Sequence, residues 1–141
     1  MTQACIYCAQ DERIDKLMIE ICKLRVSTVY LFREQTYPGR CIVALNEHAR
    51  EFFHLPQDTQ DAFMRDVAQT ASAIERAFGP DKINYGAFGD TMPHLHFHVV
   101  PKYEGGHAWG KMFEMNPADN LQLSDEVYKE RIAAILEQLQ A

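Results

Sequence analysis

PHLHFHVVP, at residues 93–101, predicts a β-strand with one polar and one apolar face. Three histidines alternate with apolar residues, and a proline stands at each end. Successive side chains of a strand point to opposite faces. The imidazoles of His94, His96 and His98 are therefore predicted to share one face, while the residues between them enter a core. Rings spaced roughly 7 Å apart along a strand form a natural site for phosphate or a metal ion.

Further strands are predicted on both sides of this segment. The β-branched and aromatic run STVYLF at residues 27–32 and the apolar run CIVAL at 41–45 are separated by a turn-forming segment. This pattern predicts an antiparallel pair. Residues 83–88 are predicted to be another strand, which turns tightly at Gly89-Asp90 into the strand at 95–100.

Helices are predicted in three places by capping residues and by the helical spacing of apolar residues. They are a short helix from the cap Asn46 to His54, a long helix over Gln57–Phe78 bounded by Pro56 and Gly79, and a last helix over 124–139. Residues 102–120 are predicted to be a loop lying over another surface. For residues 14–25 both helix and strand stay open, because apolar and charged residues mix there.

This order of elements indicates an antiparallel α+β fold with about five strands and with helices packed on one face of the sheet. The length of 141 residues predicts one domain over residues 1–141. The composition, 47% hydrophobic and 24% charged, is typical of globular proteins. A disordered or fibrous chain is therefore not expected.

Charge and hydropathy restrict the partners. A net charge of −6 disfavours long nucleic acids, since a polyanion is repelled unless cations cluster. A small phosphate ester stays compatible with it, because a few oriented N–H groups can hold one. No stretch approaches the roughly 20 apolar residues of a membrane helix, and the start lacks the pattern of a signal peptide. We expect a cytoplasmic protein without a membrane partner.

The triad segment carries a family resemblance. INYGAFGD at residues 83–90 followed by PHLHFHVVP resembles the signature of the histidine triad (HIT) family of nucleotide hydrolases and transferases. TYPGRCIVALNEHAREFFHL at 36–55 resembles the family's two strands and short helix. KYEGGHAWGKMFEMNP at 102–117 resembles the tail of a bacterial branch similar to diadenosine tetraphosphate hydrolases. The resemblance implies a HIT-like fold, a homodimer, and hydrolysis of nucleoside or dinucleoside polyphosphates or of nucleoside phosphoramidates, with dinucleoside polyphosphates as the leading substrates.

The resemblance also implies catalytic roles. His96 would be the nucleophile that forms a nucleotidyl-histidine intermediate, which water then hydrolyses. Its other ring nitrogen would be held by an acceptor such as a backbone carbonyl, which sets the tautomer. His98 would contact an α-phosphate oxygen or the leaving group. Asn84 matches a family asparagine near the phosphate, with a strand-edge residue as the alternative.

Substrate-binding residues are implied with two departures from the family pattern. Glu34 stands where the family has an aspartate that binds the ribose hydroxyls, with a solvated loop residue as the alternative. Asp90 stands where many members carry glutamine; a carboxylate beside phosphate is unfavourable unless it is protonated or turned away, and a turn residue is the alternative. Thr91 would supply the missing donor. His107 and Trp109 would close over the leaving group or base, with a surface or loop residue as the alternative for His107.

A structural zinc site is also suggested, and no organic cofactor is expected. Cys5 and Cys8 stand at C-x-x-C spacing, and two histidines would complete the four ligands that structural zinc prefers. By position in the family these would be His48 and His94. Unligated thiols and a redox pair stay open as alternatives. The other two cysteines lie in apolar runs and are interpreted as core residues.

Two rival functions stay open beside hydrolysis through a histidine adduct. In the first, the histidines chelate the catalytic metal of a hydrolase, although no carboxylates stand at a suggestive spacing. In the second, the same pocket binds adenosine nucleotides without turnover. The first is identified if the His96→Ala variant loses the bound metal and the unaltered protein forms no nucleotide adduct. The second is identified if the protein binds nucleotides tightly without hydrolysing them.

Overall fold

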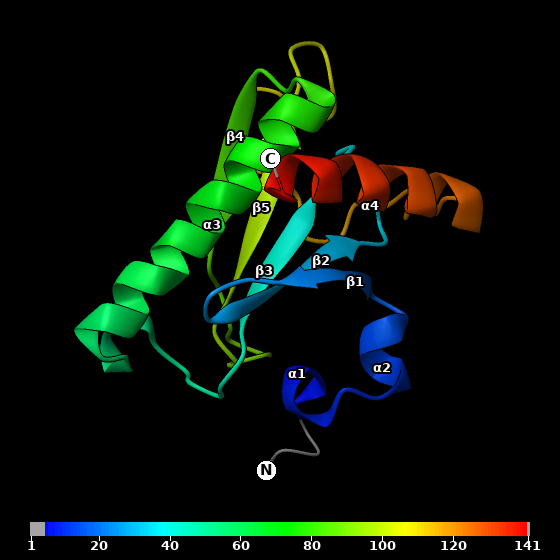
Figure 1. Cartoon of the computed structure of the whole chain (residues 1–141). Coiled ribbons are helices and arrows are strands. Elements are labelled where there is room, and N and C mark those ends of the chain that lie inside the picture. The colour runs from blue at the N-terminus through cyan, green and yellow to red at the C-terminus, as the bar shows by residue number, and fades with distance from the viewer. Residues whose placement is uncertain (1–4, 141) are drawn as a thin grey trace.

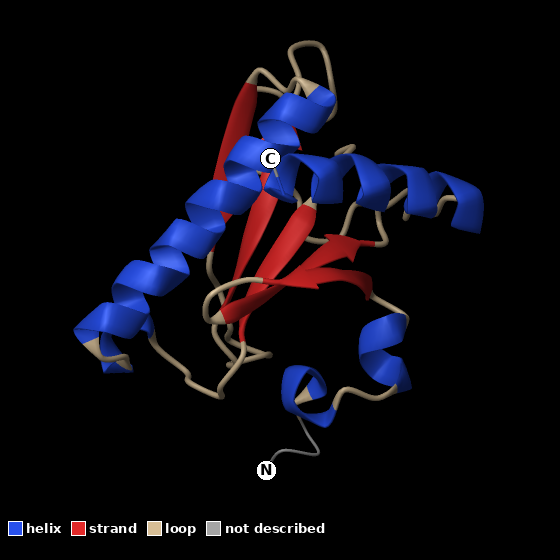
Figure 2. Ribbon diagram, viewed as in Figure 1, coloured by secondary structure: helices blue, strands red, loops and turns tan. Residues whose placement is uncertain are grey.

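Five antiparallel strands form one sheet in the computed structural model, which describes residues 5–140 (Figures 1 and 2). They are β1 (Met18–Lys23), β2 (Ser27–Phe32), β3 (Cys41–Leu45), β4 (Lys82–Gly86) and β5 (His96–Lys102). Their order across the sheet is β1-β2-β3-β5-β4. The predicted antiparallel α+β fold with about five strands is confirmed.

Helices lie on both faces of this sheet. They are α1 (Ile6–Ala9), α2 (Glu12–Asp15), the 3-10 turn η2 (Phe52–His54), α3 (Gln57–Phe78) and α4 (Asp125–Gln140). The two long helices, α3 and α4, cover one face as predicted, and the short α1 packs against the opposite face (Figure 1). The prediction that helices occupy one face therefore holds for the long helices only. Within residues 5–140 no helix has the length and apolarity needed to span a membrane.

Local expectations are confirmed for the long helix and wrong at two turns. Helix α3 spans Gln57–Phe78 and ends on Gly79, whose φ of 65° lies in the left-handed region that glycine adopts without strain. Asn46 does not cap a helix, because its backbone N–H donates to Val26 and its side chain accepts from Thr28. The predicted tight turn at Gly89-Asp90 is instead a longer connection, since β4 ends at Gly86 and β5 begins at His96.

The ambiguous segment divides between both alternatives. Residues at its start finish α2, and Met18–Lys23 forms β1. The register of β1 on β2 shifts between Glu20 and Cys22. A bulge of this kind interrupts the period of two by which side chains alternate, which explains why the sequence pattern of β1 left both a helix and a strand open.

Asp66 fastens α3 to the turn between β1 and β2. Its buried carboxylate accepts from the backbone N–H groups of Arg25 and Val26 at 3.2 and 3.0 Å, and from the Ser27 hydroxyl at 2.7 Å. It also forms an ion pair of 3.0 Å with the Arg25 guanidinium. One side chain therefore satisfies several donors at once.

We expect Asp66→Ala to lower the free energy of unfolding by about 3–5 kcal/mol, because buried donors lose their acceptor. Urea unfolding of the variant measures this loss. Asp61→Ala, which removes an exposed carboxylate from the same helix, is the control. A loss below about 1 kcal/mol, the range of ordinary surface substitutions, would contradict this role for Asp66.

Candidate active site

β5 directs two histidines to the face of the sheet opposite α3. His96 and His98 stand opposite Ala44 and Ile42 of β3. Phe97, between them, points the other way and packs edge-on against an aromatic ring of α3. The alternation predicted from the sequence therefore holds for these two rings, whose centroids are 5.4 Å apart.

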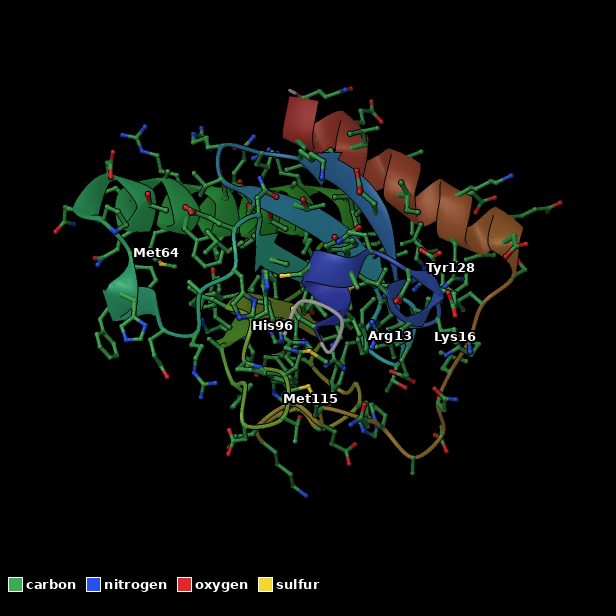
Figure 3. All side chains as sticks on the ribbon, turned by 90° about the horizontal axis from the view of Figure 1, so that it is seen from below. Arg13, Lys16, Met64, His96, Met115 and Tyr128 are labelled. Atoms are coloured by element: carbon green, nitrogen blue, oxygen red, sulfur yellow. The ribbon has the colours of Figure 1, made fainter. Side chains whose placement is uncertain are left out.

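A cavity of about 200 Å³ lies over the two rings. Its walls are mostly apolar and come from distant parts of the chain: Tyr7 of α1, Phe32 of β2, Thr91 before β5, and Met115 of the loop after β5. Figure 3 shows His96 and Met115 close to the centre of this face, beside α1. The cavity is thus formed by segments that only folding brings together.

Hydrogen bonding fixes the tautomer of His96. Its Nδ1 lies 2.6 Å from the backbone oxygen of His94. Because a carbonyl oxygen only accepts, Nδ1 carries the proton, and Nε2 keeps an unshared electron pair. Burial lowers the pKa of His96 below its ordinary value, so the ring is neutral near pH 7. His96 therefore has the form of a nucleophile.

His98 has the opposite tautomer. Its Nδ1 lies 3.1 Å from Nη2 of Arg40, and because a guanidinium only donates, Nδ1 of His98 accepts and Nε2 carries the proton. Burial, followed by the charges of Arg40 and His96, lowers the pKa of His98 to about 3. The site thus combines a neutral nitrogen nucleophile with a neutral N–H donor, which is the equipment for attack on an electrophile whose oxygens gain charge.

His94 turns away from this pair into a cluster with Cys5, Cys8 and His48. Its Nδ1 lies 3.3 and 3.5 Å from the two thiol sulfurs and 3.2 Å from Nδ1 of His48, and Cys8 lies 3.3 Å from that same nitrogen. Tetrahedral zinc with ordinary bond lengths places its nitrogen and sulfur ligands about 3.3–3.8 Å apart. Nε2 of His94 donates to the Leu45 carbonyl at 2.7 Å, which leaves Nδ1 free to ligate. The four residues therefore fit a zinc ion.

Of the predicted substrate-binding residues, Thr91 lines the cavity over His96. Asp90 lines a different cavity, which reaches Phe97 on the opposite face of β5. Glu34 lines an adjoining cavity that shares Phe32 with the histidine cavity. The Glu34 carboxylate already accepts hydrogen bonds from Thr36 and from the backbone of the loop before α4. Binding of ribose by Glu34 would have to replace some of these bonds.

Three other predicted residues lie outside the histidine cavity. Asn84 and Trp109 line a separate cavity together with Lys102, at the far end of β5. His107 pairs with Glu114 in the loop after β5. Roles for these side chains at the reacting phosphate stay predictions.

Arg40 and Tyr7 are the neighbours of the histidines that the sequence analysis missed. Tyr7 packs against both His94 and His96, with ring centroids 5.1 Å apart in each case. Arg40 stands directly before β3 and is fully buried. The sequence offered one signal for Arg40: it is a charged residue placed between a Pro-Gly turn and the buried run CIVAL. Nothing in the sequence distinguished Tyr7.

Comparison with known proteins gives consistent matches. Residues 21–105 match the family model described as HIT domain. An uncharacterized HIT-like protein of Methanocaldococcus jannaschii is 30% identical over 97 residues, which cover 65% of this chain and 71% of that protein. Adenosine 5'-monophosphoramidase of Schizosaccharomyces pombe is 24% identical over 135 residues, covering 88% of this chain and 96% of that enzyme. The crystal structure of a histidine triad protein from Sinorhizobium meliloti superposes with a TM-score of 0.81 at 27% identity, covering 91% and 94% of the two chains.

Proposed function

We propose, since this chain belongs to the HIT family, that it is a nucleotide hydrolase in which His96 attacks the α-phosphorus of a nucleoside phosphoanhydride or phosphoramidate. One observation carries the proposal: the bond from Nδ1 of His96 to the His94 carbonyl leaves the electron pair of Nε2 available beside a mostly apolar cavity. A neutral imidazole of this kind is a competent nucleophile near pH 7.

The reaction has two steps. In the first, Nε2 of His96 forms a bond to phosphorus, and the bond from phosphorus to the leaving group breaks with its electron pair. In the second, water adds to phosphorus and gives up a proton to solvent, the bond to nitrogen breaks with its electron pair returning to Nε2, and the nucleoside monophosphate departs with neutral His96 restored. Nδ1–H stays bonded to the His94 carbonyl throughout and stabilises the charge that the ring acquires.

The size and polarity of the surroundings support a nucleotide as substrate. The histidine cavity is mostly apolar, and it adjoins a cavity of about 480 Å³ that is lined by Lys16, Arg33 and Glu34. An apolar wall suits a purine ring, while polar groups suit a ribose and its phosphates. The similarity to an adenosine 5'-monophosphoramidase favours adenosine as the nucleoside. Diadenosine polyphosphates and adenosine phosphoramidates are therefore the substrates to assay.

Mass spectrometry of protein quenched in acid-free denaturant during turnover tests the mechanism. We expect a mass increase of one nucleoside monophosphate minus water, located on the peptide that contains His96. Replacing the substrate with the free monophosphate is the control and leaves the mass unchanged. Hydrolysis without an adduct on this peptide in single-turnover experiments would overturn the mechanism, and binding without hydrolysis of either substrate class would identify a nucleotide-binding protein instead.

We also propose that the cluster of Cys5, Cys8, His48 and His94 holds a structural zinc ion. The donor set and the distances support zinc, and the four ligands leave no open position for a substrate. The ion would tie α1 to the segment just before β5. It would thereby steady the His94 carbonyl that orients His96, without taking part in the reaction.

A further inference from the structure

Arg40 is a buried cation without a carboxylate partner. Its residue is fully buried, and no carboxylate oxygen in residues 5–140 lies within ion-pair distance of its guanidinium. Its Nε has no hydrogen-bond partner at all. Burying a charge without a partner of opposite charge costs free energy. One of the groups that it contacts is the His98 ring.

The surroundings hold Arg40 in this position. Its guanidinium lies over the ring of Phe32, 4.2 Å from the centroid, and 5.3 Å from that of Phe113. Nη1 donates to the Glu114 carbonyl at 3.3 Å, and Nη2 donates to Nδ1 of His98 at 3.1 Å. Aromatic faces attract a cation without supplying an anion that would neutralise it. The full positive charge therefore remains beside His98.

The contact decides which proton transfers His98 can make. Nδ1 of His98 accepts a hydrogen bond from the Arg40 guanidinium, which does not release its proton. If His98 gave up the proton on Nε2, the ring would therefore become an imidazolate anion. It cannot instead become an imidazolium, because the only site for a second proton already faces Arg40. His98 can thus donate a hydrogen bond to a phosphate or leaving-group oxygen, but it cannot transfer a proton.

We propose, on the basis of the function proposed above, that Arg40 is a positioning residue that keeps His98 neutral with its proton on Nε2 and so restricts the site to leaving groups that depart as anions. When a phosphoanhydride is attacked by His96, the bond from phosphorus to the bridging oxygen breaks, and the oxygen keeps the electron pair as part of a phosphate that needs no proton. In a phosphoramidate of an alkylamine, the nitrogen must gain a proton before it leaves. Among the described residues that line the cavity, His98 is the histidine placed to supply it, and Arg40 prevents this.

The substrate class is tested by kinetics with matched substrates. We expect wild-type kcat/KM for diadenosine tetraphosphate to exceed that for an alkylamine phosphoramidate of adenosine by about 10²–10⁴-fold, the usual contribution of a general acid. In a series of phosphoramidates, kcat should fall steeply as the amine becomes more basic. Equal or faster cleavage of the alkylamine compound would overturn the inference while leaving the proposed function standing. Absence of any hydrolysis or adduct would instead overturn the proposed function.

The tautomer is tested separately, by nitrogen NMR of the histidine rings. Charged or titratable groups near His98 are Arg40 and His96, with Glu34 and Tyr37 beyond Arg40. We expect wild-type His98 to show an unprotonated Nδ1 and a protonated Nε2 from pH 8 down to pH 4. In Arg40→Gln, which keeps a donor but removes the charge, the pKa of His98 should rise, and the preference for diadenosine tetraphosphate should narrow by at least about tenfold.

Two further variants keep this test decisive. Arg40→Lys retains charge and donor, so it should retain the wild-type tautomer and preference if it folds. Arg76→Gln, on the exposed side of α3, is the matched control and should change neither readout. A wild-type His98 that carries its proton on Nδ1, or that titrates near pH 6 in the presence of Arg40, would overturn the inference even if every Arg40 variant were unfolded.

Discussion

Replacing His96 with glycine should lower kcat for nucleotide hydrolysis by at least about 10⁴-fold, because no other described nitrogen in the cavity combines a free electron pair with a fixed orientation. The ring is buried between Tyr7 and His98, so its loss leaves a space of about the size of imidazole. Free imidazole should fill that space and restore part of the activity. Rate measurements with and without imidazole check both effects.

Two controls separate the chemistry of His96 from its packing. His54→Ala removes an exposed imidazole from η2 and should leave kcat unchanged. His96→Asn keeps a polar side chain without a nucleophilic ring, and it should be as inactive as the glycine variant while folding normally. Substantial hydrolysis by either His96 variant in the absence of imidazole would disprove covalent catalysis at this residue.

Much of the fold followed from local patterns, because apolar spacing and the residues that begin and end an element are features of a short stretch of sequence. Ser27–Phe32, Cys41–Leu45 and Gln57–Phe78 have the predicted boundaries. The failures share a physical cause. Asn46 has the chemistry of a helix cap, yet distant partners, Thr28 of β2 and Val26 just before it, bind its polar groups. A competition of this kind, between residues about twenty positions apart, leaves no periodic signal in the sequence.

The site was predictable to the extent that it depends on strand geometry. Alternation along β5 placed His96 and His98 on one face. The same alternation wrongly grouped His94 with these two histidines. His94 precedes the strand, and its ring turns to the cysteines. The role of Arg40 could not be anticipated, because the tautomer of His98 depends on a contact between residues 58 positions apart. Dimerisation and a cytoplasmic location stay predictions.

Removing the zinc ligands should lower both the zinc content and the thermal stability. We expect the wild-type protein to bind one zinc ion per chain and the Cys5→Ser, Cys8→Ser double variant to bind none. Small peptides with structural zinc sites bind the ion with a free energy of about 10–16 kcal/mol, and part of that binding free energy stabilises the fold. A loss of about 3 kcal/mol would lower Tm by roughly 10 °C in a domain of this size. Elemental analysis and thermal unfolding measure the two effects.

The position of the ion also predicts how activity responds. His94 ligates through Nδ1 while its carbonyl holds His96, so loss of zinc should loosen the nucleophile and lower kcat by about 10–100-fold, much less than loss of His96 itself. Cys22→Ser, which changes a cysteine of β1 outside the cluster, is the control and should keep both zinc and activity. If the wild-type protein stays free of zinc after reconstitution under reducing conditions, the four residues are not a zinc site. If the double variant loses zinc without any fall in Tm, the ion does not hold α1 to the catalytic strand.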